Sequence, residues 1–320
     1  MGKVTRREFL AQVVAAGVLL PFRQMAASPP ERSGRWVRRA SLPFPRTEVS
    51  VVALEGKVYV VGGYAHGQVN QPYNQAYDPA TDTWRDLAPM PRGLNHVAVA
   101  GFRGRLYAFG GFTEQNRNPV SDCSVYDVQE NRWSRVAPLP TPRGGASAVE
   151  LRGLLHVVGG RDRQSVGTHE VYDPTADRWS PRAPLPDPRD HMGLVVLEER
   201  IHAIGGRFNT FANNLAKHHV YDPVRDRWEE RAPLPRPRSG VAAAVLRGRI
   251  YIFGGEETGR VFPDNDAYDP QTDRWIPMAP MPTPRHGTGA AAVGDWIYIP
   301  AGGLTVGGSQ PSDIHEAFQP

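Results

Sequence analysis

The sequence has very little cysteine and no long hydrophobic run. Its single cysteine, Cys123, cannot form an internal disulfide, so the fold is expected to depend on packing and hydrogen bonds. Cys123 lies just before Tyr126 in an apolar segment, which favours a small buried hydrophobe over a reactive thiol. The longest largely apolar stretch, residues 11–22, is shorter than the roughly 20 residues that a membrane-spanning helix needs.

An excess of one charge is also missing. The net charge is +4 at pH 7, from 37 basic and 33 acidic residues that are interspersed along the chain. Residues 1–27 supply +3 of this charge, because Lys3, Arg6, Arg7 and Arg23 are offset only by Glu8. The rest of the chain, at +4 less +3, carries +1 and has no basic run. We therefore expect no nucleic-acid partner.

The first residues read as a targeting segment. The pair Arg6-Arg7, followed by Phe9-Leu10, an apolar run and the small residues of 25–28, resembles a twin-arginine export signal. We predict a signal peptide over residues 1–27, a short linker over 28–35, and a location in the periplasm, outside the cell or in the cell envelope. No cysteine follows the apolar run, so a lipid anchor is not expected.

What the sequence has in abundance is glycine at regular spacing. Six Gly-Gly pairs follow one another at intervals of 48, 49, 46, 49 and 48 residues, and they begin at Gly62, Gly110, Gly159, Gly205, Gly254 and Gly302. A period near fifty indicates one structural unit repeated six times.

Each unit contains the pattern of four short strands. A small apolar run, a tight polar turn and a β-branched or aromatic run lead up to the glycines, as in residues 97–109 and 241–253. A variable polar stretch and a third run ending in Tyr-Asp follow, and a Trp comes seven residues after each Tyr. These tryptophans are Trp84, Trp133, Trp179, Trp228 and Trp275. Six stacked four-stranded antiparallel sheets predict an all-β, six-bladed propeller.

The two ends of the repeat region complement each other. The sixth unit stops at residues 318–320 without a Trp strand, whereas Trp36 stands in residues 36–46 with no preceding unit. Trp36 lies ten residues before Arg46, the same spacing as Trp133 to Arg143. We predict that the N-terminal strand joins the last blade and closes the ring formed by residues 36–320.

These residues resemble the kelch-repeat family: a strand, Gly-Gly, a variable loop, Tyr-Asp, six further residues and Trp. The resemblance covers residues 36–320 and implies the propeller fold of the galactose oxidase and kelch type. It implies much less about activity, because one fold hosts many functions.

Strand direction places the loops after Gly-Gly and the Pro-Arg loops between blades at the same end of the ring, and we predict a ligand-binding face there. Six arginines after proline are candidate ligand-binding residues, because guanidinium groups bind carboxylates, sulfates and phosphates. The alternative is that an arginine present in every repeat serves the fold of the repeat. These arginines are Arg46, Arg92, Arg143, Arg189, Arg238 and Arg285.

Residues that break the repeat pattern near these arginines are the candidates for acid–base chemistry. Glu48, His96, Glu256 and His286 are the candidate catalytic residues, with solvated loop positions as the alternative interpretation. His156 and His202 stand where other units have Tyr, so we assign them to blade interfaces. An adjacent Tyr-His pair, which a copper oxidase of this fold needs, does not occur, and no nucleotide-binding glycine loop is present. We expect no cofactor and no metal ligands, and His218 and His219 point to opposite faces of one strand.

Besides a structural subunit whose blades support a larger complex, two functions remain open at this point. The first is an exported, monomeric recognition module that binds an anionic glycan, an acidic peptide or a cell-envelope protein. The second is a cofactor-free epimerase or mutarotase, similar to the bacterial kelch enzymes that act on N-acetylneuraminic acid. A carboxylate and a histidine that converge within hydrogen-bond reach of an arginine at the channel mouth would favour the enzyme over the recognition module.

Overall fold

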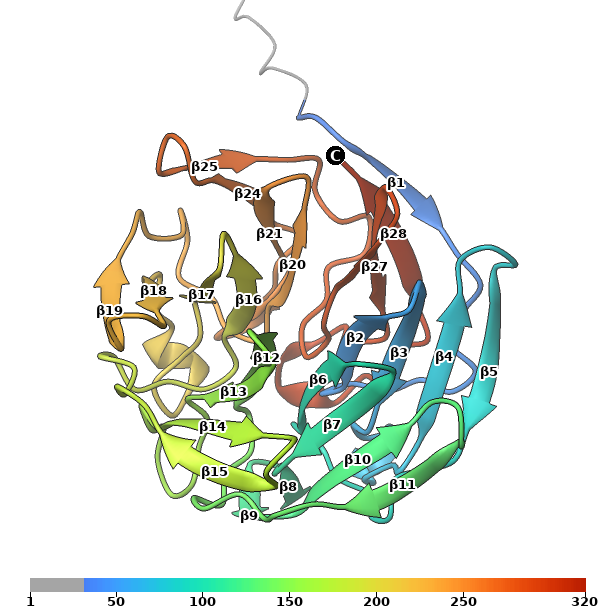
Figure 1. The fold of residues 1–320 in the computed structure, drawn as a ribbon. Helices are drawn as coiled ribbons and strands as arrows, with labels where there is room; N and C mark the ends of the chain where they lie inside the picture. The colour runs from blue at the N-terminus through green and yellow to red at the C-terminus, as the bar shows by residue number, and fades with distance from the viewer. Residues whose placement is uncertain (1–31) are drawn as a thin grey trace, which may run out of the picture. The chain divides into compact units, whose positions relative to one another are not determined.

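The computed structural model describes residues 32–320, which form a ring of six four-stranded antiparallel sheets around a central axis (Figure 1). The predicted six-bladed all-β propeller is therefore confirmed. The first strands of successive blades contact one another and form the innermost layer. The predicted signal peptide, residues 1–27, lies outside the described residues. Within the described residues, no helix is long and apolar enough to cross a membrane.

Each of the first three blades is one four-stranded sheet whose strands follow one another in chain order. Blade 1 contains β2 (Ser50–Leu54), β3 (Lys57–Val61), β4 (Asn74–Asp78) and β5 (Thr83–Leu87). Blade 2 contains β6 (Ala98–Phe102), β7 (Arg105–Phe109), β10 (Cys123–Asp127) and β11 (Arg132–Arg135). Blade 3 contains β12 (Ser147–Leu151), β13 (Leu154–Val158), β14 (His169–Asp173) and β15 (Arg178–Pro181).

The last three blades complete the ring. Blade 4 contains β16 (Gly193–Leu197), β17 (Arg200–Ile204), β18 (His218–Asp222) and β19 (Arg227–Glu230). Blade 5 contains β20 (Ala242–Leu246), β21 (Arg249–Phe253), β24 (Asn265–Asp269) and β25 (Arg274–Pro277). Blade 6 contains β26 (Ala291–Val293), β27 (Trp296–Pro300), β28 (His315–Gln319) and β1 (Arg35–Arg38).

The loops after the Gly-Gly pairs hold the remaining short elements. Two small hairpins are formed by β8 (Phe112–Glu114) with β9 (Arg117–Pro119) and by β22 (Glu256–Glu257) with β23 (Arg260–Val261). Three 3-10 turns are η1 (His66–Gln68), η2 (Phe211–Asn213) and η3 (Val306–Gly308).

Each blade is tied to the preceding blade through one alanine. The indole Nε1 of Trp228 donates to the Ala183 carbonyl at 2.9 Å, and the Ala183 N–H donates to Asp226 Oδ1 at 2.9 Å. Asp226 Oδ1 also accepts the Tyr221 hydroxyl at 2.6 Å. The same tryptophan contact recurs at Trp84, Trp133, Trp179 and Trp275. The Tyr-Asp and Trp spacing of the repeat therefore serves the contacts between blades.

The ring closes as the sequence predicts, because β1 pairs antiparallel with β28 in blade 6. Trp36 lies opposite Phe318, and its Nε1 donates to the Ala279 carbonyl at 3.0 Å. The Ala279 N–H donates to the Ser33 carbonyl, where the other blades use an Asp or Asn side chain. This seam leaves blade 6 with the same four strands as the others.

The side chains between blades are mostly apolar, with a few buried histidines. His156 Nδ1 lies 2.9 Å from His169 Nε2, and the same arrangement joins His202 to His218. Burial lowers the pKa of His156 and of His202 to about 3, so both are neutral at pH 7. The assignment of His156 and His202 to blade interfaces is confirmed, and Cys123 is buried as expected.

Candidate functional site

The Pro-Arg loops and the loops after Gly-Gly meet at one end of the ring. In every blade a single antiparallel bridge joins the two: Thr47 to Tyr64, Asn95 to Phe112, Gly144 to Arg161, Asp190 to Arg207, Ser239 to Glu256 and His286 to Gly303. The prediction that both loop sets share one end is confirmed. We call this end of the ring the loop end.

Buried charged and imidazole side chains from different blades converge on the axis just inside the loop end. We call them the axial cluster: Glu48, His96, Asp190, His191, Arg207, Glu256 and His286. None of these side chains is more than 6% exposed. Three blades have no side chain at the matching axial position, since they carry Gly145, Gly240 and Gly287 there. A Cβ on Gly287 would lie 2.7 Å from the Glu48 carboxyl, so these glycines leave room for the cluster.

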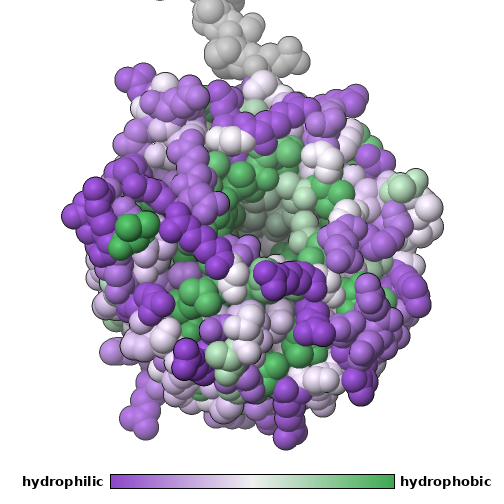
Figure 2. Space-filling view, in the orientation of Figure 1, coloured by the Kyte–Doolittle hydropathy of each residue, from purple (hydrophilic) through white to green (hydrophobic). Residues whose placement is uncertain are grey.

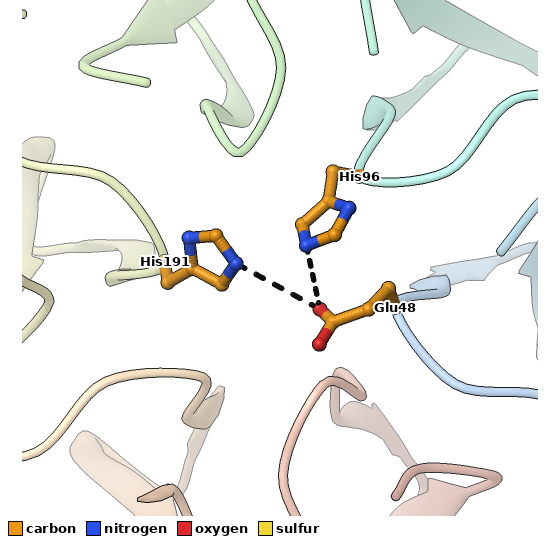
Figure 3. A group of neighbouring side chains, drawn as sticks. All are labelled: Glu48, His96 and His191. Carbon is orange, nitrogen blue, oxygen red and sulfur yellow. Dashed lines mark ion pairs between the residues drawn. The ribbon is translucent and has the colours of Figure 1, made fainter. Parts of the chain in front are cut away.

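One half of the cluster is centred on Glu48. Its carboxylate lies 3.1 Å from His96 Nε2, 3.6 Å from His286 Nε2 and 4.0 Å from His191 Nε2. Figure 3 shows His96 and His191 approaching Glu48 from two other blades. Burial acts to raise the pKa of Glu48, but the three imidazoles outweigh burial and hold that pKa below its usual range. Glu48 is therefore a carboxylate at pH 7.

The other half is centred on Arg207. Its guanidinium donates to Glu256 at 2.7 Å, to Asp190 at 3.1 Å and to His191 Nε2 at 2.9 Å. His286 Nε2 lies 3.3 Å from Glu256 and so joins the two halves. Burial and the Arg207 charge lower the pKa of His191, which keeps that imidazole neutral at pH 7.

The loop of blade 6 covers this cluster at the loop end. The Gly307 N–H donates to Glu256 at 2.9 Å, and the Gly307 carbonyl accepts Gln115 Nε2 at 2.7 Å. Gly308 packs so closely on Tyr64 that a Cβ would lie 2.6 Å from its hydroxyl oxygen. The η3 turn therefore contacts residues from blades 1, 2 and 5 above the cluster.

On its other side the cluster faces the central channel. The cavity there has a volume of about 160 Å³, and it is lined by Glu48, His96 and His191 and by small apolar residues of the innermost strands. Figure 2 shows the molecule hollowed at its centre, with hydrophobic residues lining the hollow. An apolar channel that ends on buried ionisable groups resembles the general design of a small-ligand site.

Comparison with known proteins decides the family. A family model described as "KLHDC2/KLHL20/DRC7 Kelch-repeats domain" matches residues 49–233 and 180–317. The chain belongs to the Kelch-repeat family. Mouse Kelch-like protein 35 is 35% identical over 83 residues, and an F-box/kelch-repeat protein of Arabidopsis thaliana is 35% identical over 91 residues.

These relatives are matched only in part. The matched segments cover 26% and 27% of this chain but only 14% and 24% of the two relatives, so the chain spans a minor part of their length. The solved structure of YjhT has a TM-score of 0.74 and covers 88% of this chain and 99% of its own, at 17% identity. That likeness establishes the Kelch propeller fold alone.

Within this Kelch propeller, five of the six predicted ligand-binding arginines lie inside the blades. Arg46, Arg143, Arg189, Arg238 and Arg285 are at most 1% exposed. Each is bonded within its own blade, as when Arg285 donates to Glu316 at 2.8 Å and to the Ile314 carbonyl at 2.7 Å. The structure thus gives these five residues the blade-holding role that was the alternative interpretation. Their ligand-binding role remains a prediction that this geometry does not support.

Arg92, the sixth, is exposed and forms a surface ion pair with Asp122 at 3.2 Å. In blade 2, Leu94 stands where the other blades have the buried arginine. Leu94 lies ten residues after Trp84, the same spacing as from Trp133 to Arg143. The matching third-strand partner is also changed, to Ser124. The six arginines named as candidates therefore lie in two different settings, five inside the blades and one on the surface.

The four candidate catalytic residues, by contrast, all belong to the axial cluster. Glu48, His96, Glu256 and His286 are linked through distances of 3.1, 3.6 and 3.3 Å. Asp190 and His191 follow Arg189 and break the repeat pattern there, but, like Arg207, they were not among the four candidate catalytic residues. The sequence carried one signal for His191, since it lies two residues after Arg189 as Glu48 lies two after Arg46.

Proposed function

We propose that this Kelch propeller is a recognition module that binds a protein partner at its loop end. The observation that carries the proposal is the placement of exposed apolar side chains. Of six large hydrophobic side chains exposed in the described residues, four belong to the loop end: Phe44, Val69, Phe208 and Leu304. Exposed apolar side chains that lie at one end of the ring favour that end as the place where a partner binds.

Charges at the loop end also favour a protein over a polyanionic glycan. Three of the exposed arginines there are paired with acids, namely Arg92 with Asp122, Arg117 with Glu114, and Arg260 with Glu257, whereas exposed Arg163 forms no ion pair within the described residues. Such pairs leave little free positive charge for a sulfated or carboxylated polymer. A mixture of apolar side chains and paired charges is typical of protein–protein interfaces.

The test compares two matched sets of exposed hydrophobic residues. Phe208→Ser with Leu304→Ser removes apolar area from the loop end, whereas Val224→Ser removes it from an exposed turn outside the loop end. A partner is first identified by cross-linking in cell-envelope extracts, and its binding is then measured with both purified proteins. We expect the loop-end variant to weaken binding at least tenfold and Val224→Ser to leave it unchanged. Equal binding by both variants would contradict the proposal.

We also propose that the chain is exported by the twin-arginine route. The proposal rests on the sequence Arg6-Arg7 before an apolar run. Replacing both arginines by lysine should retain the protein inside the cell, as cell fractionation would show. Unchanged export of the double variant would remove this proposal.

A second function, the sugar epimerase or mutarotase, is favoured by one observation. The carboxylates and histidines that such an enzyme needs converge in the axial cluster and line the end of the channel. NMR of anomer exchange with N-acetylneuraminic acid tests it, and Glu48→Gln should abolish any exchange. If exchange in the presence of the wild-type protein proceeds at the uncatalysed rate, the enzyme proposal is contradicted and only the recognition module remains.

A further inference from the structure

Three of the six blades carry a side chain where the fold favours glycine. The matching axial positions have φ values of 65°, 66° and 61° at Gly145, Gly240 and Gly287. Glu48, His96 and His191 occupy the same positions with φ values of 54°, 53° and 56°. A non-glycine residue in this left-handed region is strained, and such strain concentrates at functional sites. The sequence thus keeps exactly three axial side chains that the backbone disfavours, and all three meet at one point.

The two histidines present matching nitrogens to that point. His96 Nδ1 lies against Asn95 Oδ1, and His191 Nδ1 lies against Asp190 Oδ1. Since both partners are acceptors, each Nδ1 carries a proton, which leaves Nε2 as the nitrogen that each ring can offer to a metal ion. Figure 3 shows both Nε2 atoms directed at the Glu48 carboxylate. A histidine held through Nδ1 by an amide or carboxylate oxygen is the usual arrangement of a metal ligand.

The charges of the axial cluster leave a deficit of positive charge. Glu48, Asp190 and Glu256 are three buried carboxylates, and Arg207 is the one guanidinium in the cluster. The carboxylates outnumber the guanidinium by three to one, and a buried carboxylate without a compensating positive charge is costly. His96 Nε2 is buried and has no hydrogen-bond partner among the described residues. A divalent cation would balance the charge and use this nitrogen.

We propose that Glu48, His96 and His191 bind a divalent first-row transition-metal ion, with Zn²⁺ as the reference ion. The three ligand atoms lie within 4.8 Å of one another. Zinc bonds of about 2.1 Å in tetrahedral geometry need ligand atoms roughly 3.4 Å apart. The Glu48 carboxylate oxygen lies 3.1 Å from His96 Nε2 and 4.0 Å from His191 Nε2, distances that bracket this value.

Arg207 must turn one nitrogen away for the ion to bind. Its Nη2 donates to His191 Nε2 at 2.9 Å, whereas Nε and Nη1 bind Asp190 and Glu256. The two carboxylates hold the guanidinium after that single contact is lost. The remaining coordination position faces the channel, because all three ligands line its cavity. This metal site departs from the expectation, based on sequence, that the chain has no metal ligands.

A second group of possible ligands serves as a control. Asp187, His219 and Glu230 also lie within 4.8 Å of one another, but their carboxylates are 41% and 63% exposed. Lys217 pairs with both of these carboxylates, so their charge is already offset. Replacing His219 therefore leaves the axial cluster intact while removing a histidine beside two acids.

The test measures Zn²⁺ and Co²⁺ binding by the purified protein after dialysis against a chelator. We expect one equivalent of Zn²⁺, a raised melting temperature, and visible Co²⁺ absorption typical of low coordination number. His96→Gln, His191→Gln and Glu48→Gln should each weaken binding roughly 100-fold or more. His219→Gln should bind as the wild type does.

The variants His96→Gly and His191→Gly control for the possibility that the glutamine variants do not fold. Glycine occupies the same position in the other three blades, so these two variants are expected to fold. We expect both variants to fold without metal and to lose binding. Metal binding that persists in these variants, or that disappears in His219→Gln alone, would overturn the proposal. Absence of stoichiometric binding by the wild type would overturn it as well.

Discussion

Arg285→Ala should strongly destabilise the ring. The Arg285 side chain is fully buried, and it donates to Glu316 at 2.8 Å and to the Ile314 carbonyl at 2.7 Å. Burial lowers the pKa of Arg285 to about 10, so the group remains charged at pH 7. Its removal leaves the buried Glu316 carboxylate with Thr283 Oγ1 as its remaining side-chain partner. Breaking a buried ion pair in this way costs about 3–5 kcal/mol.

The assay is urea unfolding, with thermal melting as a second measurement. At roughly 2 °C per kcal/mol for a chain of this size, the melting temperature should fall by about 6–10 °C. Arg92→Ala is the matched control, because its ion pair with Asp122 has both side chains about half exposed and is worth about 1 kcal/mol or less. The double variant Arg285→Met with Glu316→Leu should recover most of the loss, since no charge stays buried.

One result would refute this reasoning. If Arg285→Ala unfolds within about 1 kcal/mol of the wild type and weakens an anionic ligand, the arginine serves binding rather than the blade. Equal destabilisation by Arg92→Ala and Arg285→Ala would likewise contradict a role that depends on burial.

Three further predictions concern the rest of the ring. His156 and His202 have folded pKa values of about 3 against about 6.5 when unfolded. Their stabilising effect is therefore complete above pH 6.5 and is lost as the pH falls towards 3. Urea midpoints at pH 7 and 4.5 should show this loss, and His156→Tyr with His202→Tyr should reduce it. Trp36→Ala should cost about 3 kcal/mol by opening the seam, measured by urea unfolding, and an unchanged midpoint would argue against closure by β1. Asp226→Ala should cost about 2 kcal/mol, because the Ala183 N–H and the Tyr221 hydroxyl both lose their acceptor, and Asp226→Asn should recover part of it.

The sequence predicted the ring well, because the features that build it recur in every repeat. The period of the Gly-Gly pairs gave the number of blades, and the unpaired Trp36 gave the closing strand. The placement of the arginines could not be predicted, because a residue after Pro at the start of the innermost strand can point to the axis or back into the blade. The ten-residue spacing from Trp84 to Leu94 already marked Arg92 as out of position.

The axial cluster was predictable only in part. Glu48 and His96 were found as departures from the repeat, but their meeting with His191 depends on backbone dihedral angles that direct all three side chains inward. These residues are 48 and 95 positions apart in sequence order, so no local spacing connects them. Aligning the glycines Gly145, Gly240 and Gly287 with them is the one sequence signal that identifies the position as left-handed.

The seam of blade 6 places the first and the last strand of the propeller in one sheet. Arg35 lies opposite Gln319, so the first and last strands of the propeller are immediate neighbours. A short peptide joining them would allow circular permutation, with new ends opened at the exposed turn beside Val224. Blade 4 would then be built from both ends of the chain, and blade 6 would be continuous. The relative stabilities of permuted and native chains would measure how much the position of the seam matters to a ring of similar blades.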